Sequence, residues 1–262
     1  IAVPAAIRNG VLLVGKEPEG ARRVTAGAGA AALACLDLLV SLGMKRQNIL
    51  VTDIAGVVYA GRTEIMDPYK ARYAVETPHR TLEEALTDAD IFLGLSAGGI
   101  LKAPWLNKMA ENPLIFALAN PNPEILPEEA QAARPDAVIA TGRTDYPNQV
   151  NNVLCFPFLF RGALDCGATE INEPMKLACL EAIAALARAR PSDIVRQAYG
   201  GKDLRFGPEY LIPKPFDPRL MEVVAPAVAA AAMASGVATR PIEDLEASRQ
   251  GRHNRVIPTR MT

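Results

Sequence analysis

The sequence predicts an α/β fold built on a doubly wound parallel sheet. Five short apolar runs are expected to form its strands, at residues 22–26, 48–53, 90–96, 114–120 and 137–141. Segments whose apolar residues recur at helical spacing separate these runs. Because near-continuous apolar strands that alternate with helices are typical of parallel sheets covered on both faces, this order indicates one such sheet.

The first strand leads directly into a glycine-rich turn. The run VTAGAGAAA at residues 24–32 has the G-x-G-x-x-A form of a dinucleotide-binding turn and continues into a helix. Gly27 permits the tight turn, Gly29 lets a pyrophosphate approach the backbone, and Ala32 lets the helix pack closely on the strand. The turn predicts a Rossmann-like sheet, although the same letters also fit a plain strand-to-helix connection.

The remaining elements follow from local signals. Thr81 and Glu84 have capping-box spacing, and Pro104 suits the first turn of a helix. Segment 56–80 is rich in turn-forming residues and is expected to be irregular, whereas the proline-rich segment 191–218 is expected to form an ordered, extended arm. The expected helices lie at residues 3–15, 28–43, 81–86, 104–111, 127–133, 153–164, 173–190 and 225–235.

This pattern predicts two domains. Residues 1–190 form a dinucleotide-binding domain. Residues 191–262 form a C-terminal proline-rich arm, a helix and a tail, which pack on that domain or on a partner domain. The tail from Ser248 is basic and low in apolar residues, so it is expected to be loose.

The composition excludes several classes of function. The chain has 262 residues, a net charge of −1 and only 5% aromatic residues, so neither a basic field nor stacking platforms point to nucleic acid. Its four cysteines are scattered and form no C-x-x-C pair, which speaks against a structural zinc site. No apolar run reaches the roughly 18–20 residues of a membrane span and no signal peptide is visible, so we expect a cytoplasmic protein that binds no membrane.

Each strand is expected to end on a chemically distinctive residue. Parallel α/β sheets bind ligands at the carboxyl ends of their strands, so these residues predict a cofactor site. Asp53 follows Gly27 by 26 positions, near the place where this fold presents a carboxylate to an adenosine ribose. The strand-end groups are Gly27-Ala28-Gly29, Asp53, Gly94-Leu95-Ser96, Asn120-Pro121 and Thr141-Gly142-Arg143.

Ser96 supports a competing hypothesis. Residues 94–98 read GLSAG and match the G-x-S-x-G nucleophile elbow of serine hydrolases. Asp145 or Asp165, followed by His253, would complete the hydrolase order. No long helix follows Ser96 directly, His253 lies in the basic tail, and the glycine turn would have no role. The alternative interpretation of Ser96 is a loop hydroxyl that faces a bound ligand.

Three asparagines lie where a ligand is expected. Asn120 ends a strand before a proline, and Asn151 and Asn152 begin a helix. Their amides offer both donors and acceptors, which suits a carboxamide ring or a small hydroxy acid. A turn residue at Asn120 and an N-cap at Asn151 or Asn152 are the structural alternatives. His79, by contrast, has no partner at metal spacing and is expected to be structural or solvated.

These segments resemble the nucleotide-binding domain of malic enzyme. The resemblance is to the bacterial NADP-dependent type, which often carries a phosphotransacetylase-like domain. The resemblance extends to about residue 245 and includes the proline-rich arm. The matching segments are GAGAAA at 27–32, GLSA at 94–97, FALANPNPEI at 116–125, TGRTDYPNQVNNVL at 141–154 and FPFLFRGALD at 156–165.

The resemblance implies a cofactor, a reaction and partners. Malic enzymes oxidise malate and decarboxylate the product to pyruvate, with reduction of NADP or NAD and with Mg²⁺ or Mn²⁺ bound. The implied partners are malate or pyruvate, an N-terminal malic domain and further copies of the chain in a homo-oligomer. The residues expected to bind the cofactor are Gly27, Ala28, Gly29, Ala30, Asp53, Ser96 and Asn120, and those expected to bind the substrate are Asn120 and Asn152.

The choice between NAD and NADP stays open at this point. Asp53 would favour a free 2′-hydroxyl and repel a 2′-phosphate. Arg62 or Lys70 in the following loop would offset that charge. The resemblance favours NADP.

The catalytic groups are expected outside this chain. In the family, the general-base lysine, the tyrosine acid and the metal-binding carboxylates lie upstream of the position that Ile1 matches. The resemblance therefore implies no catalytic or metal-binding residue here, and a chain that binds a dinucleotide without turning over malate. A non-catalytic binding or assembly module is the alternative hypothesis.

Overall fold

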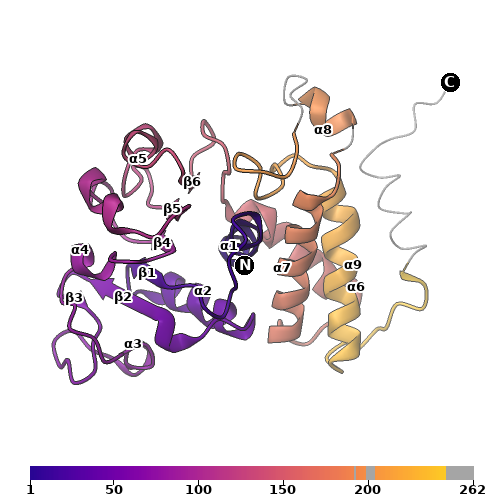
Figure 1. Cartoon of the computed structure of the whole chain (residues 1–262). Helices are drawn as coiled ribbons and strands as arrows, with labels where there is room; N and C mark the ends of the chain where they lie inside the picture. Colours follow the sequence, from indigo (N-terminus) through magenta and orange to yellow (C-terminus); the bar gives the residue numbers. More distant parts are fainter. Residues whose placement is uncertain (192, 199–203, 246–262) are drawn as a thin grey trace. The chain divides into compact units, whose positions relative to one another are not determined.

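The computed structural model describes residues 1–191, 193–198 and 204–245 of the chain (Figure 1). The chain divides into two compact units, one formed by Ile7–Val150 and the other by Ile1–Ala6 together with Asn151–Thr262. The expected functional boundary at 190/191 is a different division and stays a prediction. The basic tail from Ser248, with His253, lies outside the described residues.

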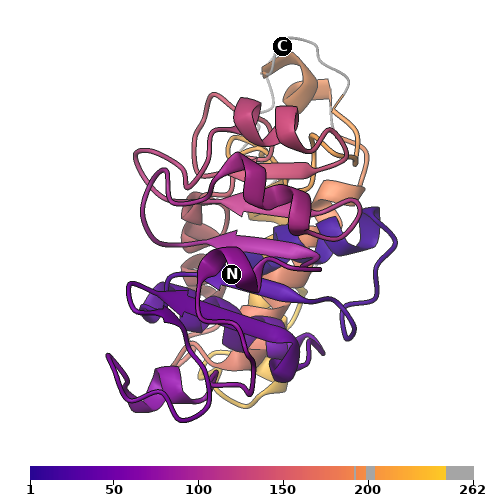
Figure 2. The ribbon, with the colours of Figure 1, turned by 60° about the vertical axis from the view of Figure 1, so that its left-hand side comes forward.

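A six-stranded sheet forms the centre of unit Ile7–Val150, and its strands lie side by side in Figure 2. The strand order is β3-β2-β1-β4-β5-β6, and every neighbouring pair is parallel except β2 and β3. The predicted Rossmann-like parallel sheet is confirmed. The strands are β1 (Arg23–Ala26), β2 (Ile49–Asp53), β3 (Gly56–Val57), β4 (Ile91–Gly94), β5 (Leu114–Ala117) and β6 (Val138–Thr141).

The sheet continues one strand further than the sequence predicts. β3 lies in the segment 56–80 that was expected to be irregular, and it pairs antiparallel with the end of β2. Two residues are too few to produce a strand periodicity, so its formation depends on the neighbouring edge of β2.

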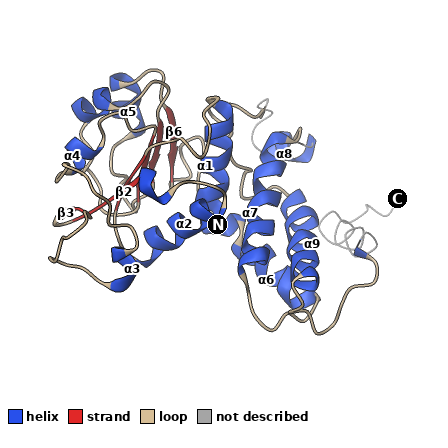
Figure 3. Ribbon diagram, turned by 60° about the horizontal axis from the view of Figure 1, so that its bottom comes forward, coloured by secondary structure: helices blue, strands red, loops and turns tan. Residues whose placement is uncertain are grey.

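Helices cover both faces of this sheet, as Figure 3 shows. On one face Val24, Phe92 and Ile115 form a buried cluster with residues of α4 (Leu82–Ala85), η2 (Ala103–Lys108) and α5 (Pro127–Ala133). On the other face lies α2 (Ala30–Ser41), together with the end of α1 (Ala2–Leu13), where a Cβ at Gly10 would stand 2.9 Å from Leu114 Cδ1 of β5. Burial on both faces explains why the strands are apolar along their whole length.

Two short helices in this unit show how local signals set the helix starts. The predicted capping box of α4 is present, with Thr81 and Glu84 bonded reciprocally. The helix predicted over 104–111 is present as the 3₁₀ helix η2, which ends earlier than predicted, at Lys108. The sequence did not predict α3 (Pro68–Ala71), which Asp67 caps by accepting hydrogen bonds from two backbone N–H groups. A short 3₁₀ helix, η1 (Arg46–Asn48), precedes β2.

Helices make up the other unit. They are η3 (Asn152–Leu154), α6 (Phe156–Asp165), α7 (Glu173–Arg188), α8 (Asp193–Ala198) and α9 (Arg219–Ala234). α7 and α9 lie alongside each other in Figure 1. The predicted start of the last helix at residue 225 is late, because α9 begins at Arg219 and continues through Pro226. The Asp217 carboxylate accepts a hydrogen bond from the Arg219 N–H and stabilises this earlier start.

The proline-rich segment is ordered where it is described. Tyr210, Leu211 and Ile212 are buried in it, whereas Phe216 is exposed. α8 interrupts the expected extended course. No helix in the described part of the chain combines the length and the hydropathy that crossing a membrane requires.

Candidate cofactor-binding site

The glycine turn lies between the ends of β2 and β4. The Gly27 N–H donates to the carbonyl of Thr52 at 2.8 Å, and the Leu95 N–H donates to the carbonyl of Ala26 at 2.8 Å. Gly27 has a φ of +109°, and a Cβ there would stand 2.5 Å from the Leu95 carbonyl oxygen. Conformation and space therefore both require glycine at this position.

Gly29 begins α2 as its N-cap residue. Its backbone is extended, its position supplies no side-chain cap, and a Cβ there would meet nothing within 4 Å. Gly29, Ala30 and Ala31 are exposed, so the first turn of α2 is open to a ligand next to the glycine turn. An anion at this end of a twelve-residue helix would be stabilised by the backbone N–H groups of that turn and by the helix dipole.

The strand order places the turn at the switch point of the sheet. β1 is bonded to β2 on one side and to β4 on the other, and the chain proceeds outward from β1 in opposite directions. Ligands of open α/β sheets bind in the crevice outside the strand ends at such a point. The turn at Gly27 to Ala30 and the loop of Ser96 border this crevice.

Asp53 is held by two buried cations. Its two carboxylate oxygens accept hydrogen bonds from Arg62 Nη2 at 2.7 and 2.6 Å, and one of them accepts a bond of 2.7 Å from Lys70 Nζ. The backbone N–H of Ala55 is a further donor, at 2.9 Å. Burial by itself would raise the pKa of Asp53, but the bonds from Arg62 and Lys70 outweigh it and hold the pKa below its ordinary value.

These contacts change what Asp53 offers to a ligand. The side chains of Asp53, Arg62 and Lys70 are 10%, 2% and 7% exposed, so the three charges form one nearly buried cluster. The carboxylate already accepts four hydrogen bonds, which is its usual capacity. Direct binding of a ribose by Asp53 stays a prediction, and the cluster carries a formal charge of +1 rather than −1.

Sequence reasoning missed Ile54. This side chain follows Asp53 directly and is 94% exposed, more than any other large apolar residue in the described part of the chain. In the sequence, Ile54 is recognisable only as an apolar residue that follows the acidic residue at the end of a strand. It provides an apolar surface at the carboxyl end of β2.

Ser96 and the loop after β5 are joined by Glu124. One carboxylate oxygen accepts from the Ser96 N–H at 3.0 Å and the other from the Ala119 N–H at 3.0 Å. Ser96 Oγ lies 3.4 Å from the first of these oxygens. Sequence reasoning missed Glu124 as well, because a single glutamate in a proline-rich turn gives no signal of burial.

The surroundings of Ser96 do not fit a hydrolase. An irregular loop follows Ser96, and the next element is the 3₁₀ helix η2, whereas a nucleophile elbow requires a strand, a turn and then a helix. Asp145 pairs with Arg143, and Asp165 pairs with Arg161. The one described histidine, His79, lies in the loop before α4, so no described histidine is placed as a base for Ser96.

Asn120 lies at the end of β5, beside the end of β6. Its side chain amide is 3.3 Å from the position that a Cβ of Gly142 would occupy, and the residue is exposed. Arg143, which follows Gly142, forms a two-point ion pair with Asp145. Asn120 is therefore presented at the same sheet edge as Ser96 and the glycine turn.

Asn152 belongs to the helical unit. Its neighbour Asn151 is the N-cap of η3 and accepts from the Val153 N–H at 3.0 Å, so the structural interpretation is confirmed for Asn151. The Asn152 residue is exposed. Its role toward malate or nicotinamide stays a prediction. Within the described ranges, no three His, Cys, Asp or Glu side chains are grouped to hold a metal ion.

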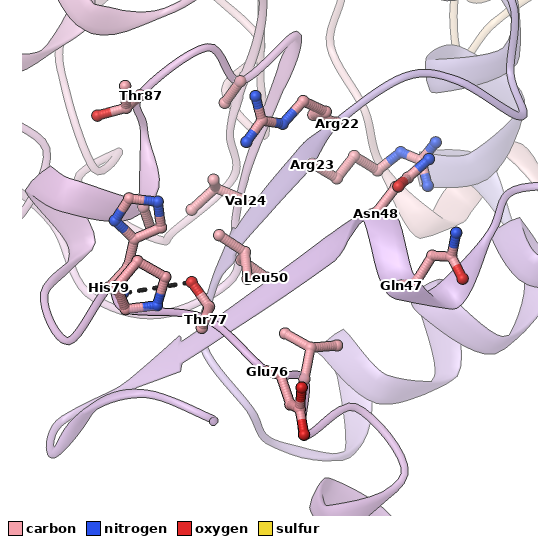
Figure 4. A pocket seen from close by; sticks show the side chains of 14 residues that line it. Arg22, Arg23, Val24, Gln47, Asn48, Leu50, Glu76, Thr77, His79 and Thr87 are labelled. Atoms are coloured by element: carbon pink, nitrogen blue, oxygen red, sulfur yellow. Dashed lines mark hydrogen bonds between the residues drawn. The ribbon is translucent and has the colours of Figure 1, made fainter. Parts of the chain in front are cut away.

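A pocket of about 290 Å³ lies at the opposite edge of the sheet (Figure 4). Val24 and Leu50 form part of its apolar floor, and Arg22, Thr77 and His79 contribute to its polar rim. It is close to the amino ends of β1 and β2, so it is separate from the candidate cofactor site at the carboxyl ends of the strands. His79 lines this pocket as a partly exposed residue, and its backbone N–H donates to Thr77 Oγ1.

Comparisons with known proteins identify the family of this chain. The family model described as "Malic enzyme, NAD binding domain" matches residues 2–196. The NAD-dependent malic enzyme of Rhizobium meliloti is 62% identical over 94% of this chain, and the NADP-dependent malic enzyme of Salmonella typhimurium is 61% identical over 93%. Each alignment covers 32% of the relative, so the chain spans about a third of the length of these proteins.

Solved structures give the same result. The malic enzyme of Pyrococcus horikoshii is 35% identical, with a TM-score of 0.83, over 98% of this chain and 57% of that chain. The malic enzyme of Entamoeba histolytica is 31% identical, also with a TM-score of 0.83, over 97% of this chain and 51% of that chain. The chain belongs to the malic enzyme family and contains the NAD-binding domain of that family.

Proposed function

We propose that this chain binds NADP or NAD along the carboxyl ends of β1, β2, β4 and β5. The observation that carries the proposal is the turn from Gly27 to Ala30, which lies at the switch point of the sheet and leaves the first N–H groups of α2 open. These N–H groups would bind the pyrophosphate, and Ile54 would contact the adenine. Ser96 and Asn120 would border the nicotinamide half.

We propose that the full-length protein uses this site for the oxidative decarboxylation of malate to pyruvate. The bound dinucleotide supplies the hydride acceptor. Asn120 is expected to orient the nicotinamide ribose or the substrate through its amide, and Asn152 is expected to face malate or nicotinamide. Mg²⁺ or Mn²⁺, an N-terminal malic domain and assembly into a homo-oligomer belong to the same proposal, as does a cytoplasmic location.

The cluster around Asp53 supports NADP as an accepted cofactor. An unpaired carboxylate at the end of β2 would repel a 2′-phosphate. Here Arg62 and Lys70 surround the carboxylate, and the three groups together are cationic. We therefore expect the 2′-phosphate to be tolerated, with NADP binding at least as tightly as NAD.

Calorimetric titration of this chain with NADP and with NAD tests the cofactor proposal. We expect saturable binding of at least one dinucleotide, and lack of binding of both at millimolar concentration would contradict it. With malate and Mn²⁺ added, we expect no formation of reduced cofactor by this chain alone. Steady turnover would show that the chain already contains the groups we assign to the rest of the protein.

Gly29→Ala tests the position of the pyrophosphate. A methyl group at Gly29 meets no atom of a more distant residue within 4 Å, and alanine is only a poorer N-cap than glycine, so the unfolding temperature should fall only slightly. The same methyl group would stand where the phosphates approach the backbone, and affinity for the dinucleotide should fall about tenfold or more. Gly20→Ala, in the loop before β1, is the matched control and should change neither quantity.

A further inference from the structure

Glu124 is a buried carboxylate that pairs with backbone N–H groups rather than with a cation. Its relative exposure is 0%, and its two oxygens accept from Ser96 and from Ala119. No ion pair to Glu124 occurs among the described residues. Burial raises the pKa of Glu124, and the bonds from the Ala119 and Ser96 N–H groups lower it by less. Burying a carboxylate without a paired cation costs free energy, so the position of Glu124 indicates a specific role.

The end of β4 leaves space for this carboxylate. A Cβ at Gly94 would stand 2.5 Å from each of the two Glu124 oxygens and even closer to the carboxyl carbon. The φ of Gly94 is not in the left-handed region, so its backbone conformation suits any residue. The absence of a side chain at Gly94 therefore serves the position of Glu124 and not the geometry of the turn.

Glu124 connects two loops that leave neighbouring strands. One loop follows β4 and contains Ser96, and the other follows β5 and contains Ala119 and Asn120. Two backbone hydrogen bonds also join these loops farther along, from Gly99 to Pro123 and from Leu101 to the Glu124 carbonyl, each at 3.0 Å. Near the strand ends, however, the Glu124 side chain links Ser96 to Ala119 through its own hydrogen bonds.

We infer that Glu124 is a positioning residue, which fixes the loops of Ser96 and Asn120 relative to each other and so shapes the nicotinamide half of the dinucleotide site. This inference rests on the proposed function, because it assumes that a dinucleotide occupies the strand ends. Glu124 does not itself contact the ligand. It acts through the backbone of Ser96 and Ala119, next to Asn120.

Only a carboxylate satisfies all of these donors. Its oxygens carry no hydrogen and accept from both sides at once. The amide of Glu124→Gln has nearly the same shape, but its NH₂ group would face one of the two backbone N–H donors. One loop would then lose its charge-assisted hydrogen bond and keep a buried, unpaired N–H group.

The experiment compares two ligands that share the adenosine half. Calorimetry measures binding of ADP, and separately of whichever of NADP and NAD binds more tightly, to the unaltered chain and to Glu124→Gln. We expect Glu124→Gln to weaken the dinucleotide about tenfold and to leave the affinity for ADP within about twofold. Glu129→Gln, an exposed glutamate in the first turn of α5, is the control and should match the unaltered chain for both ligands.

The outcomes separate this inference from the proposed function. If the unaltered chain binds neither dinucleotide, the proposed function fails. If it binds and Glu124→Gln binds the dinucleotide equally well, or loses ADP to the same extent, then Glu124 does not position the nicotinamide half and the inference is wrong. Should Glu124→Gln not fold, Glu124→Asp is judged by the same criterion, because it keeps the charge but is one methylene too short to reach both loops.

Discussion

Replacing Asp53 with asparagine is expected to lower the free energy of unfolding of unit Ile7–Val150 by about 3–5 kcal/mol at neutral pH. The substitution removes one negative charge from a nearly buried cluster and leaves Arg62 and Lys70 facing each other without their shared partner. The cost of two uncompensated buried cations exceeds the value of the lost hydrogen bonds. The contact between Arg62, Asp53 and Lys70 therefore depends on the Asp53 carboxylate.

Urea unfolding followed by Trp105 fluorescence measures this effect. Trp105 is the single tryptophan of the chain and lies in η2, so its signal reports on the unit that contains Asp53. Asp145→Asn is the control, because Asp145 pairs with Arg143 at the surface of the same unit. A surface pair contributes little, so this variant should unfold close to the unaltered chain. Equal unfolding midpoints for both variants would contradict the role of the buried cluster.

The effect of Asp53 should depend on pH in a defined direction. The pKa of Asp53 is lowered in the folded chain, so the group stabilises the fold at every pH above its ordinary value, near 4. Below about pH 4 the unfolded chain takes up the proton first, and the stabilisation is lost as the pH falls through the folded pKa. The stability difference between the unaltered chain and Asp53→Asn should thus be full at pH 7 and should shrink below pH 4.

The sequence was sufficient for the parts of the site that backbone patterns encode. Gly27 and Gly29 are separated by one residue between a strand and a helix, and that spacing determines both the turn and the open helix start. The apolar runs determined which segments form strands, and the parallel order followed from the helices between them. The strand-end rule then predicts that Asp53, Ser96 and Asn120 lie at the carboxyl ends of the strands.

The parts that depend on contacts between distant residues were not predictable in the same way. The sequence named Arg62 and Lys70 as two candidates to offset Asp53, but not that both bind it. Glu124 gave no signal, because its partners are backbone groups and its space comes from Gly94, thirty positions earlier. Arg62, Lys70 and Glu124 are all charged residues, for which exposure is the ordinary expectation. Their burial depends on the groups with which they form hydrogen bonds, and the hydrophobic periodicity of the sequence does not reveal those groups.

Gly27→Ala is expected to destabilise the fold and to abolish binding of the dinucleotide together. An alanine with φ at +109° is strained, and its methyl group would stand 2.5 Å from the Leu95 carbonyl oxygen. That oxygen belongs to backbone held by the hydrogen bond from Leu95 to Ala26, so it cannot move aside as a flexible side chain would. Strain and displacement together should cost about 2–5 kcal/mol.

The comparison with Gly29→Ala makes this expectation specific. Both substitutions add one methyl group to the same turn, but only the group at Gly27 meets protein backbone, while the group at Gly29 meets open space. In urea unfolding followed by Trp105, Gly27→Ala should therefore shift the midpoint strongly and Gly29→Ala hardly at all, although both should lose dinucleotide affinity. A Gly27→Ala variant as stable as the unaltered chain would mean that the turn does not lie against the loop after β4. The proposed binding mode of the pyrophosphate would then be wrong, because it depends on the contact between the Gly27 turn and this loop.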